Sequence, residues 1–201
     1  IVYSVYDILN NSIYGTLTGA MDYGLHLVVP ASFIGSLKVS GNAVYADLAT
    51  LACFYVSGNG VLVNNTAFGT EQGLNTMANI ALSVLMGYQI FGGSQALTVS
   101  NCKAIDNGGH GFVVDHTSTG LVSLVGCTVS GNSRAQRGIW VTGSGPCEIE
   151  GGSISFTRSS GVYDSSTGLL SIRNVTFTDN VLDVAAPSDA AAISGGTEVV
   201  G

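Results

Sequence analysis

The sequence predicts an all-β fold, a right-handed single-stranded parallel β-helix (a solenoid) built from rungs of roughly 25 residues. Three observations predict it. Four similar segments recur at nearly constant spacing, hydrophobic and polar residues alternate within each segment, and equivalent positions carry side chains of the same kind. The segments begin at Leu97, Val122, Cys147 and Leu170, with offsets of 25, 25 and 23 residues.

Alternation within each segment predicts which side chains face the core. Leu97 and Val99 lie on one side of the first segment and Thr98 on the other, and the later segments repeat this pattern. In a parallel stack, equivalent residues of consecutive rungs lie about 4.8 Å apart, so they form columns. Two columns are predicted, Ala104, Val129, Ile154 and Phe177, and Cys102, Cys127, Gly152 and Val175.

A further strand in each rung begins at a glycine. Gly111, Gly138 and Gly161 each precede an apolar run. The first two of these glycines are 27 residues apart, two more than the offset of 25 between the segments, and the two extra residues fall in the turn 133–137. An insertion in a turn leaves the strands in register, as solenoids tolerate. Parallel crossovers are right-handed in almost all proteins, which predicts the handedness of the coil.

The chain divides into three regions. Residues 96–184 contain the regular rungs. Residues 1–95 are predicted to form longer or degenerate rungs, because the turn Val39-Ser-Gly-Asn resembles Val129-Ser-Gly-Asn. The Ala-rich residues 185–201 lose the pattern and are interpreted as a cap or a connecting tail.

Composition and charge restrict the partners. Hydrophobic residues make up 46% of the chain, enough for a core, but only 9% of residues are charged and the net charge is −7. Nucleic-acid binding needs clustered Lys and Arg, so we expect no nucleic-acid partner. The uncharged stretch 74–93 has the length of a membrane span, but Asn75, Asn79 and Gln89 interrupt it, so no span is expected. The chain begins without Met or a signal-like segment and is interpreted as a mature or excised portion.

The cysteines indicate neither a metal site nor a cofactor. Cys53, Cys102, Cys127 and Cys147 have no C-x-x-C spacing and no histidine positioned as in zinc modules. Cys102 and Cys127 are expected one rung apart, within possible disulfide range. A buried ladder of thiols is the favoured interpretation.

The rung sequences resemble those of a known group of proteins. Asn107-Gly-Gly-His-Gly-Phe-Val-Val and the Val-Ser-Gly-Asn turns look like the repeats of pectate-lyase-like proteins and of phage tailspikes and tail fibres, all right-handed β-helices. The resemblance covers roughly residues 96–184 and specifies rungs, so it implies a glycan-rich, virion or extracellular setting by analogy only. Pectate lyases also carry an acidic calcium cluster and a basic arginine, and no such cluster can be carried over.

Aromatic and basic residues suggest a ligand-binding or interface surface. Trp140 and Tyr163 are predicted to lie outside the coil in one column on adjacent rungs. Such rings can stack on the apolar faces of sugars, although burial against a neighbouring subunit is the favoured interpretation. Arg134 and Arg137, in the turn before Trp140, either bind acidic sugar groups or belong to a solvated turn, and the solvated turn is favoured.

Two glutamates are the only catalytic candidates, and weak ones. Glu148 and Glu150 share the outer side of one strand, and paired carboxyl groups can act as acid and base in glycoside hydrolysis. Arg173 is expected beside Glu150 one rung later, so a salt bridge is favoured over catalysis. His110 and His116 each lie near an aspartate and are assigned structural roles at turns.

The favoured function is a structural and host-recognition module of a virion, a fragment of a tailspike, tail fibre or head fibre that contacts host surface glycans. A homotrimer is expected, because uncharged solenoid faces are readily buried against symmetry mates. The alternative is a β-helical polysaccharide lyase or glycoside hydrolase, and a third possibility is a secreted bacterial adhesin. Enzymatic activity is left open, with a non-enzymatic function favoured.

Overall fold

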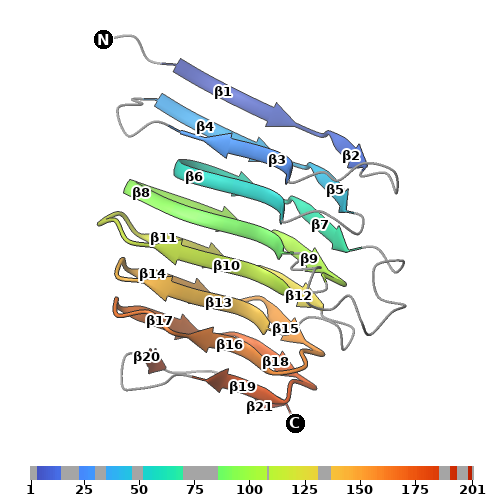
Figure 1. Ribbon diagram of the computed structural model, residues 1–201, viewed down its shortest axis with the longest axis vertical. Helices are drawn as coiled ribbons and strands as arrows, with labels where there is room; N and C mark the ends of the chain where they lie inside the picture. Colours follow the sequence, from blue (N-terminus) through green and yellow to red (C-terminus); the bar gives the residue numbers. More distant parts are fainter. Residues whose placement is uncertain are drawn as a thin grey trace.

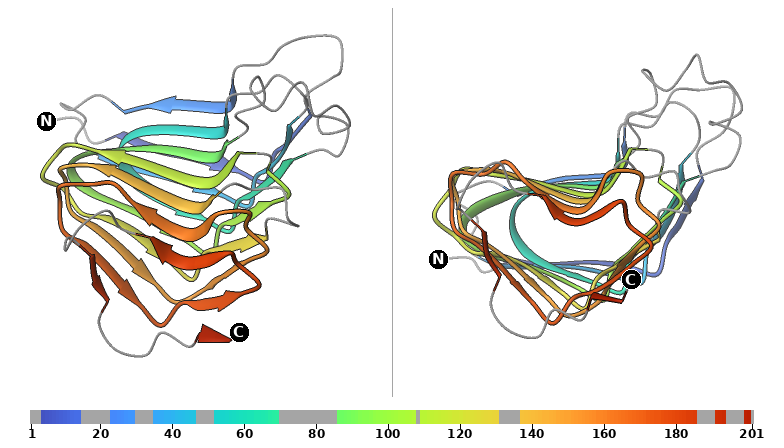
Figure 2. Two further views of the ribbon diagram at one scale, coloured as in Figure 1. Left: turned by 60° about the horizontal axis from the view of Figure 1, so that its bottom comes forward. Right: turned by 90° about the horizontal axis from the view of Figure 1, so that it is seen from below.

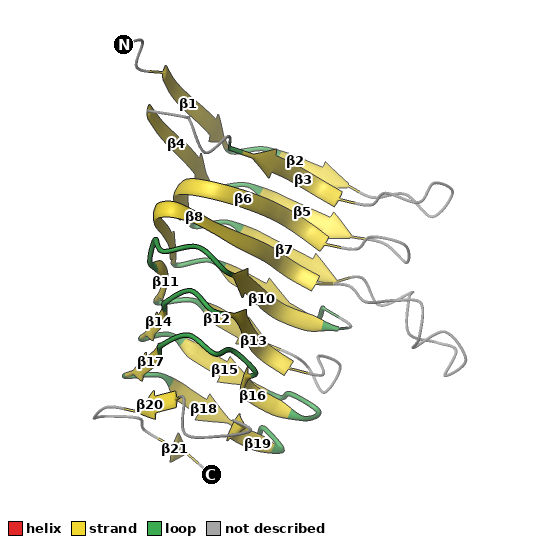
Figure 3. Ribbon diagram, turned by 60° about the vertical axis from the view of Figure 1, so that its left-hand side comes forward, coloured by secondary structure: helices red, strands yellow, loops and turns green. Residues whose placement is uncertain are grey.

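The chain forms a parallel β-solenoid. The computed structural model describes residues 4–14, 23–29, 35–46, 52–69, 86–107, 109–130, 137–185, 191–193 and 199–200. The described residues form strands and loops and contain no helix (Figure 3). Each strand pairs in parallel with its counterparts in the neighbouring rungs. The rungs stack from β1 at one end to β19, β20 and β21 at the other (Figure 1).

The rungs enclose the core with three faces, which appear as the sides of the coil when it is seen along the stack (Figure 2). The first face contains β3 (Tyr23–Val28), the first parts of β6 (Ala52–Val63) and β8 (Met86–Ser100), β10 (His110–His116), β13 (Arg137–Gly143), β16 (Ser160–Asp164) and β19 (Leu182–Ala185). The second face contains β1 (Ser4–Leu9), β4 (Gly35–Ser40), the last parts of β6 and β8, β11 (Val122–Val125), β14 (Cys147–Glu150), β17 (Leu170–Arg173) and β20 (Ala191–Ile193). The third face contains β2 (Ser12–Tyr14), β5 (Ala43–Ala46), β7 (Thr66–Gly69), β9 (Lys103–Ile105), β12 (Thr128–Ser130), β15 (Ser153–Ser155), β18 (Thr176–Thr178) and β21 (Val199–Val200).

The register predicted from the repeat is confirmed. On the second face, Val122 pairs with both Leu97 and Cys147, and Cys147 pairs with Leu170. The column that begins at Ala104 and ends at Phe177 lies on the third face as expected. The strands on either side of the turn 133–137 also stay in register, because the connection between β12 and β13 takes up the extra residues.

The proposed equivalence between Val39 and Val129 is wrong. Val39 is the penultimate residue of β4 on the second face and pairs with Leu62, whereas Val129 lies on the third face between Ala104 and Ile154. Val-Ser-Gly-Asn is a turn-forming sequence, and such a sequence can end a strand at more than one corner of the coil. The strands before residue 95 nevertheless pair in parallel with those that follow, through β6, β7 and β8.

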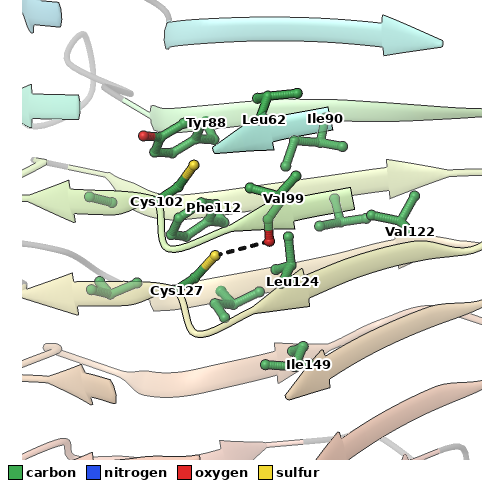
Figure 4. Packing of buried hydrophobic residues seen from close by; sticks show 14 of the residues in the cluster. Leu62, Tyr88, Ile90, Val99, Cys102, Phe112, Val122, Leu124, Cys127 and Ile149 are labelled. Atoms are coloured by element: carbon green, nitrogen blue, oxygen red, sulfur yellow. Dashed lines mark hydrogen bonds between the residues drawn. The ribbon is translucent and has the colours of Figure 1, made fainter. Parts of the chain in front are cut away.

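Buried columns of like side chains form the core. The rings of Phe54, Tyr88 and Phe112 stack with centroids 4.7 and 4.5 Å apart. Cys102 and Cys127 lie beside them as buried, unbridged thiols, and Cys127 Sγ donates to the carbonyl oxygen of Val99 at 3.4 Å (Figure 4). The column is thus a ladder of thiols rather than a disulfide.

The corner between the second and third faces has constant length and conformation. Two residues connect the faces in each rung from β1–β2 to β17–β18. The first has a positive φ and is always Asn or Gly, the residues that adopt this left-handed conformation at least cost. These residues are Asn10, Gly41, Asn64, Asn101, Gly126, Gly151 and Asn174. The corner therefore fixes where each strand of the third face begins relative to the end of the second-face strand before it.

The second corner residue points inward, and its chemistry changes along the stack. In the first rungs it is Asn11, Asn42 and Asn65, whose amides form a hydrogen-bonded ladder. Asn42 Oδ1 accepts from the backbone and side-chain nitrogens of Asn11, both at 2.9 Å. The side-chain nitrogen of Asn65 donates to the carbonyl oxygen of Val39 at 2.8 Å. Later rungs place Cys102, Cys127, Gly152 and Val175 at this position.

Candidate functional site

One row of side chains in register follows the outer side of the first face from rung to rung. Its members are His26, Tyr55, Gln89, Val113, Trp140 and Tyr163. Alternation along the strands places them opposite the core residues of the same strands. Aromatic groups therefore occupy both ends of the row, separated by Gln89 and Val113.

Trp140 and Tyr163 lie side by side, as the sequence predicts. Trp140 pairs with Tyr163 in the sheet, and both side chains are partly exposed. Their ring centroids are 6.4 Å apart with an interplanar angle of 62°. The indole Nε1 of Trp140 donates to Ser165 Oγ at 2.8 Å, which fixes the orientation of the ring.

Arg137 covers these rings. Its Cζ atom lies 4.8 Å from the centroid of Trp140 and 4.0 Å from that of Tyr163, the geometry of a double cation–π contact. Among the residues that the structure describes, no carboxylate forms an ion pair with Arg137. The second predicted base, Arg134, lies outside the described residues. The guanidinium of Arg137 thus packs on aromatic rings at the start of β13, and the solvated turn favoured for the two arginines stays a prediction.

His110 completes the group that we call the Trp140 cluster, namely His110, Arg137, Trp140 and Tyr163. Its ring meets that of Trp140 edge to face at 5.2 Å, and only 4% of the residue is exposed. Burial, and then the charge of Arg137, lowers the pKa of His110 to about 4, so the imidazole is neutral at neutral pH. Its Nδ1 atom has no hydrogen-bond partner.

Ser160 lies on the other side of Arg137. His110 pairs with Arg137, and Arg137 pairs with Ser160, so the three residues occupy one column on consecutive rungs. Ser160 is fully buried, and its Oγ atom also lacks a hydrogen-bond partner. Two unsatisfied polar groups therefore flank one cation, which is unusual because buried polar groups are nearly always paired.

The two candidate catalytic carboxylates form ion pairs. Arg173 Nη2 contacts Glu148 Oε1 and lies 3.7 Å from Glu150 Oε2 on the outer side of the second face. Arg173 therefore makes the expected contact between rungs, and its closer partner is Glu148 rather than Glu150. The arrangement is a surface ion-pair cluster, and a catalytic role for either glutamate stays a prediction.

His116 lies inside the coil at the corner between the first and second faces. Only 1% of the residue is exposed, and its Nε2 atom contacts the carbonyl oxygen of Gly120. A side chain at Gly92 or Gly145 would collide with the imidazole ring, so glycine at these positions makes room for it. The ring therefore fills a corner of the core, in agreement with the structural role expected at this turn.

Sequence reasoning missed two further aromatic groups. Tyr14, Tyr45 and Phe68 stack on the outer side of the third face with centroids 4.7 Å apart, and Tyr14 is 66% exposed. Tyr23, His26, Tyr55 and Phe91 form a second group at the N-terminal end of the first-face row. The spacing of the early rungs is uneven, so the repeat that would have aligned these rings is hidden.

The described residues contain no group of three or more His, Cys, Asp or Glu side chains placed to hold a metal ion. Nor does any helix of membrane-spanning length and hydropathy occur in the part of the chain that the structure describes. Residues 86–93 of the long uncharged stretch belong to β8, and the rest of that stretch lies outside the described residues.

Comparison with known proteins identifies the family. Residues 4–154 match the family described as "Right handed beta helix region". No curated protein and no solved structure matches the chain. The family match includes most of residues 1–95, where the repeat is hardest to see in the sequence, and it agrees with the parallel solenoid and its rungs of about 25 residues. The chain therefore belongs to the right-handed parallel β-helix family.

Proposed function

We propose that this β-helical repeat protein is a structural and host-recognition module of a virion, and that the Trp140 cluster contacts host surface glycans. The observation that supports this proposal is the pair Trp140 and Tyr163, held side by side and partly exposed on adjacent rungs. Aromatic rings contact the apolar faces of sugars, and a few fixed polar groups give orientation and specificity.

The fold suits this role because the site lies on strands rather than on loops. Trp140 and Tyr163 belong to β13 and β16, and the hydrogen bond from Trp140 to Ser165 links these two rungs. A binding site on rigid elements holds its side chains at defined spacing, here about 4.8 Å between rungs. A repeating glycan can be matched by such a regular surface.

Tryptophan fluorescence tests the proposal directly, because Trp140 is the only tryptophan in the chain. We expect titration with a panel of bacterial surface oligosaccharides to change the emission of Trp140 in a saturable way for at least one glycan. Calorimetry should then show that Tyr163→Ala weakens binding about ten-fold, whereas Tyr45→Ala, on the third face, leaves the affinity unchanged. Absence of binding across the panel would refute the proposal.

The proposal includes assembly into a homotrimer. Size-exclusion chromatography with light scattering should give three times the mass of the chain at micromolar concentration, and a stable monomer would contradict it. A secreted adhesin would bind glycans through the same surface. The two settings are distinguished by the genomic position of the gene, which the virion proposal places among phage tail genes.

A further inference from the structure

The aromatic faces of the Trp140 cluster are already occupied. The Arg137 guanidinium lies over both rings, with Cζ 4.8 and 4.0 Å from the two centroids. A neutral sugar that stacks on these faces must displace the guanidinium. A ligand that binds the guanidinium itself needs no such displacement, because a guanidinium in cation–π contact still has N–H donors to offer an anion.

Among the described residues, Arg137 has no ion-pair partner. The chain has only six basic residues and a net charge of −7, yet no described carboxylate pairs with this guanidinium. Arg173, by contrast, contacts two glutamates. An arginine left without a carboxylate in an acidic protein is suited to bind an external anion, since its fork of donors matches the geometry of carboxylates and phosphates.

The polar groups beside Arg137 support the same conclusion. His110 Nδ1 and Ser160 Oγ lie in the rungs on either side and are buried without partners. A neutral imidazole and a hydroxyl can both donate a hydrogen bond. With Arg137 they form a column of three groups on consecutive rungs, each of which can donate a hydrogen bond to an anion.

We infer that the ligand of the Trp140 cluster is an acidic glycan, in which a carboxylate or phosphate group binds Arg137 while the sugar contacts Trp140 and Tyr163. This inference rests on the proposed function, because it names the chemical class of the glycan. The anion takes the position of an ion-pair partner, and the parts of the two rings that Arg137 leaves exposed supply the apolar contact. Arg137 is thus the specificity-determining residue of the site.

Matched ligands test the inference. Three acidic oligosaccharides, containing sialic acid, glucuronic acid or a sugar phosphate, are each titrated against Trp140 emission beside a neutral counterpart that is carboxyl-reduced or dephosphorylated. At least one acidic ligand should bind about ten-fold more tightly than its neutral counterpart, and 0.5 M salt should reduce the difference. Comparison of the carboxylate ligands with the phosphate ligand shows which of the two anionic groups Arg137 binds.

Variants assign the preference to one residue. Arg137→Gln should abolish the difference between acidic and neutral ligands, and Arg137→Lys should keep only part of it, because lysine has charge without the planar fork. Arg173→Gln removes the same charge from the second face and should leave the preference intact. Circular dichroism of each variant verifies that the strands have formed.

The outcomes separate the inference from the proposed function. Equal affinity for acidic and neutral ligands would overturn the inference and leave glycan recognition standing. An acidic preference that survives in Arg137→Gln, or disappears in Arg173→Gln, would also overturn it. Absence of any binding to the acidic and neutral ligands, together with the wider glycan panel, would refute the proposed function itself.

Discussion

Among the described residues, the buried asparagines near the N-terminal end of the solenoid are hydrogen-bonded, whereas several buried polar atoms nearer the C-terminal end have no partner. Asn42 and Asn65 are 1% and 0% exposed, and their amides form hydrogen bonds within the corner ladder. Among the described residues, every buried side-chain nitrogen or oxygen without a partner comes after residue 109. These atoms belong to His110, His116, Ser160, Asp164 and Arg173.

The difference shows what repetition does for a buried polar group. An amide both donates and accepts, so a column of asparagines satisfies itself from one rung to the next. His110 and Ser160 have a different residue, Arg137, as their neighbour in the column, and no such chain of hydrogen bonds forms. Local rules of folding are most often broken at functional sites, and these two residues flank the candidate site.

Breaking the asparagine ladder in its middle should have the largest effect. Asn42→Ala removes the acceptor of Asn11 and the donor to the carbonyl oxygen of Ile8 in one neighbouring rung, and the donor to Asn65 Oδ1 in the other, so groups in two rungs lose a partner. We expect the free energy of unfolding in urea to fall by about 4 kcal/mol. Cys127→Ala, at the equivalent corner position, should cost only about 1 kcal/mol. If Asn42→Ala and Cys127→Ala lowered the free energy of unfolding by similar amounts, the asparagine ladder would stabilise its corner no more than the thiols do.

The buried histidine of the C-terminal end should make stability depend on pH. The pKa of His110 is about 4 in the folded chain and near 6.5 when unfolded, so the unfolded chain binds more protons between these values. Stability should therefore decrease by up to about 3 kcal/mol as the pH falls from 6.5 to 4, with no further contribution below that range.

This contribution is isolated by comparing variants. The difference in unfolding free energy between the wild type and His110→Gln should change across this pH range. His26→Gln, which removes an exposed histidine from the same face, is the matched control. A pH dependence that is identical in the wild type and His110→Gln would contradict the assignment.

Relief of backbone strain should give a smaller effect of opposite sign. Phe156 follows β15 with a φ of 56°, a conformation that costs a bulky residue about 1 kcal/mol. Asp106 and Asp179 occupy the equivalent position of other rungs with the same conformation. Phe156→Asn should therefore raise the midpoint of thermal unfolding, and the control Asp179→Phe should lower it. An unchanged or lower midpoint for Phe156→Asn would show that the ring makes a compensating contact.

The smallest effect is expected for a buried hydroxyl without a partner. Ser160→Ala removes an unsatisfied group, so the stability should be unchanged or higher by up to about 1 kcal/mol. Chemical denaturation measures this change. A loss of more than 1 kcal/mol would mean that Ser160 Oγ is satisfied after all, and the contrast with Asn42 would disappear.

The rungs from Leu97 to Phe177 could be predicted residue by residue, because their spacing hardly varies and the extra residues fall in a turn. Upstream, the 16 residues between β7 and β8 hide the period. The sequence Val39-Ser-Gly-Asn then suggests a wrong alignment of the rungs, because Val39 lies on the second face and Val129 on the third. The alignment of Asn65 with Cys102 could not be found by similarity, since an amide and a thiol share only their inward position.

Part of the candidate site was also predictable. Alternation places Trp140 and Tyr163 outside the coil, and the offset between their strands places them side by side. The position of Arg137 over both rings was not predictable, because a side chain that starts a strand can turn in several directions. The missing hydrogen bonds of His110 and Ser160 likewise depend on packing between rungs rather than on the pattern of the sequence.

The invariant two-residue corner has a consequence for how such a protein can change. The corner between the second and third faces keeps one length, whereas the connections from the third face back to the first differ in length, from three residues between β18 and β19 to 16 between β7 and β8. Foreign peptides grafted into these return connections should leave the outer surfaces undisturbed. A β-helix of this kind can therefore accept insertions along one edge without changes in the strands that form its faces.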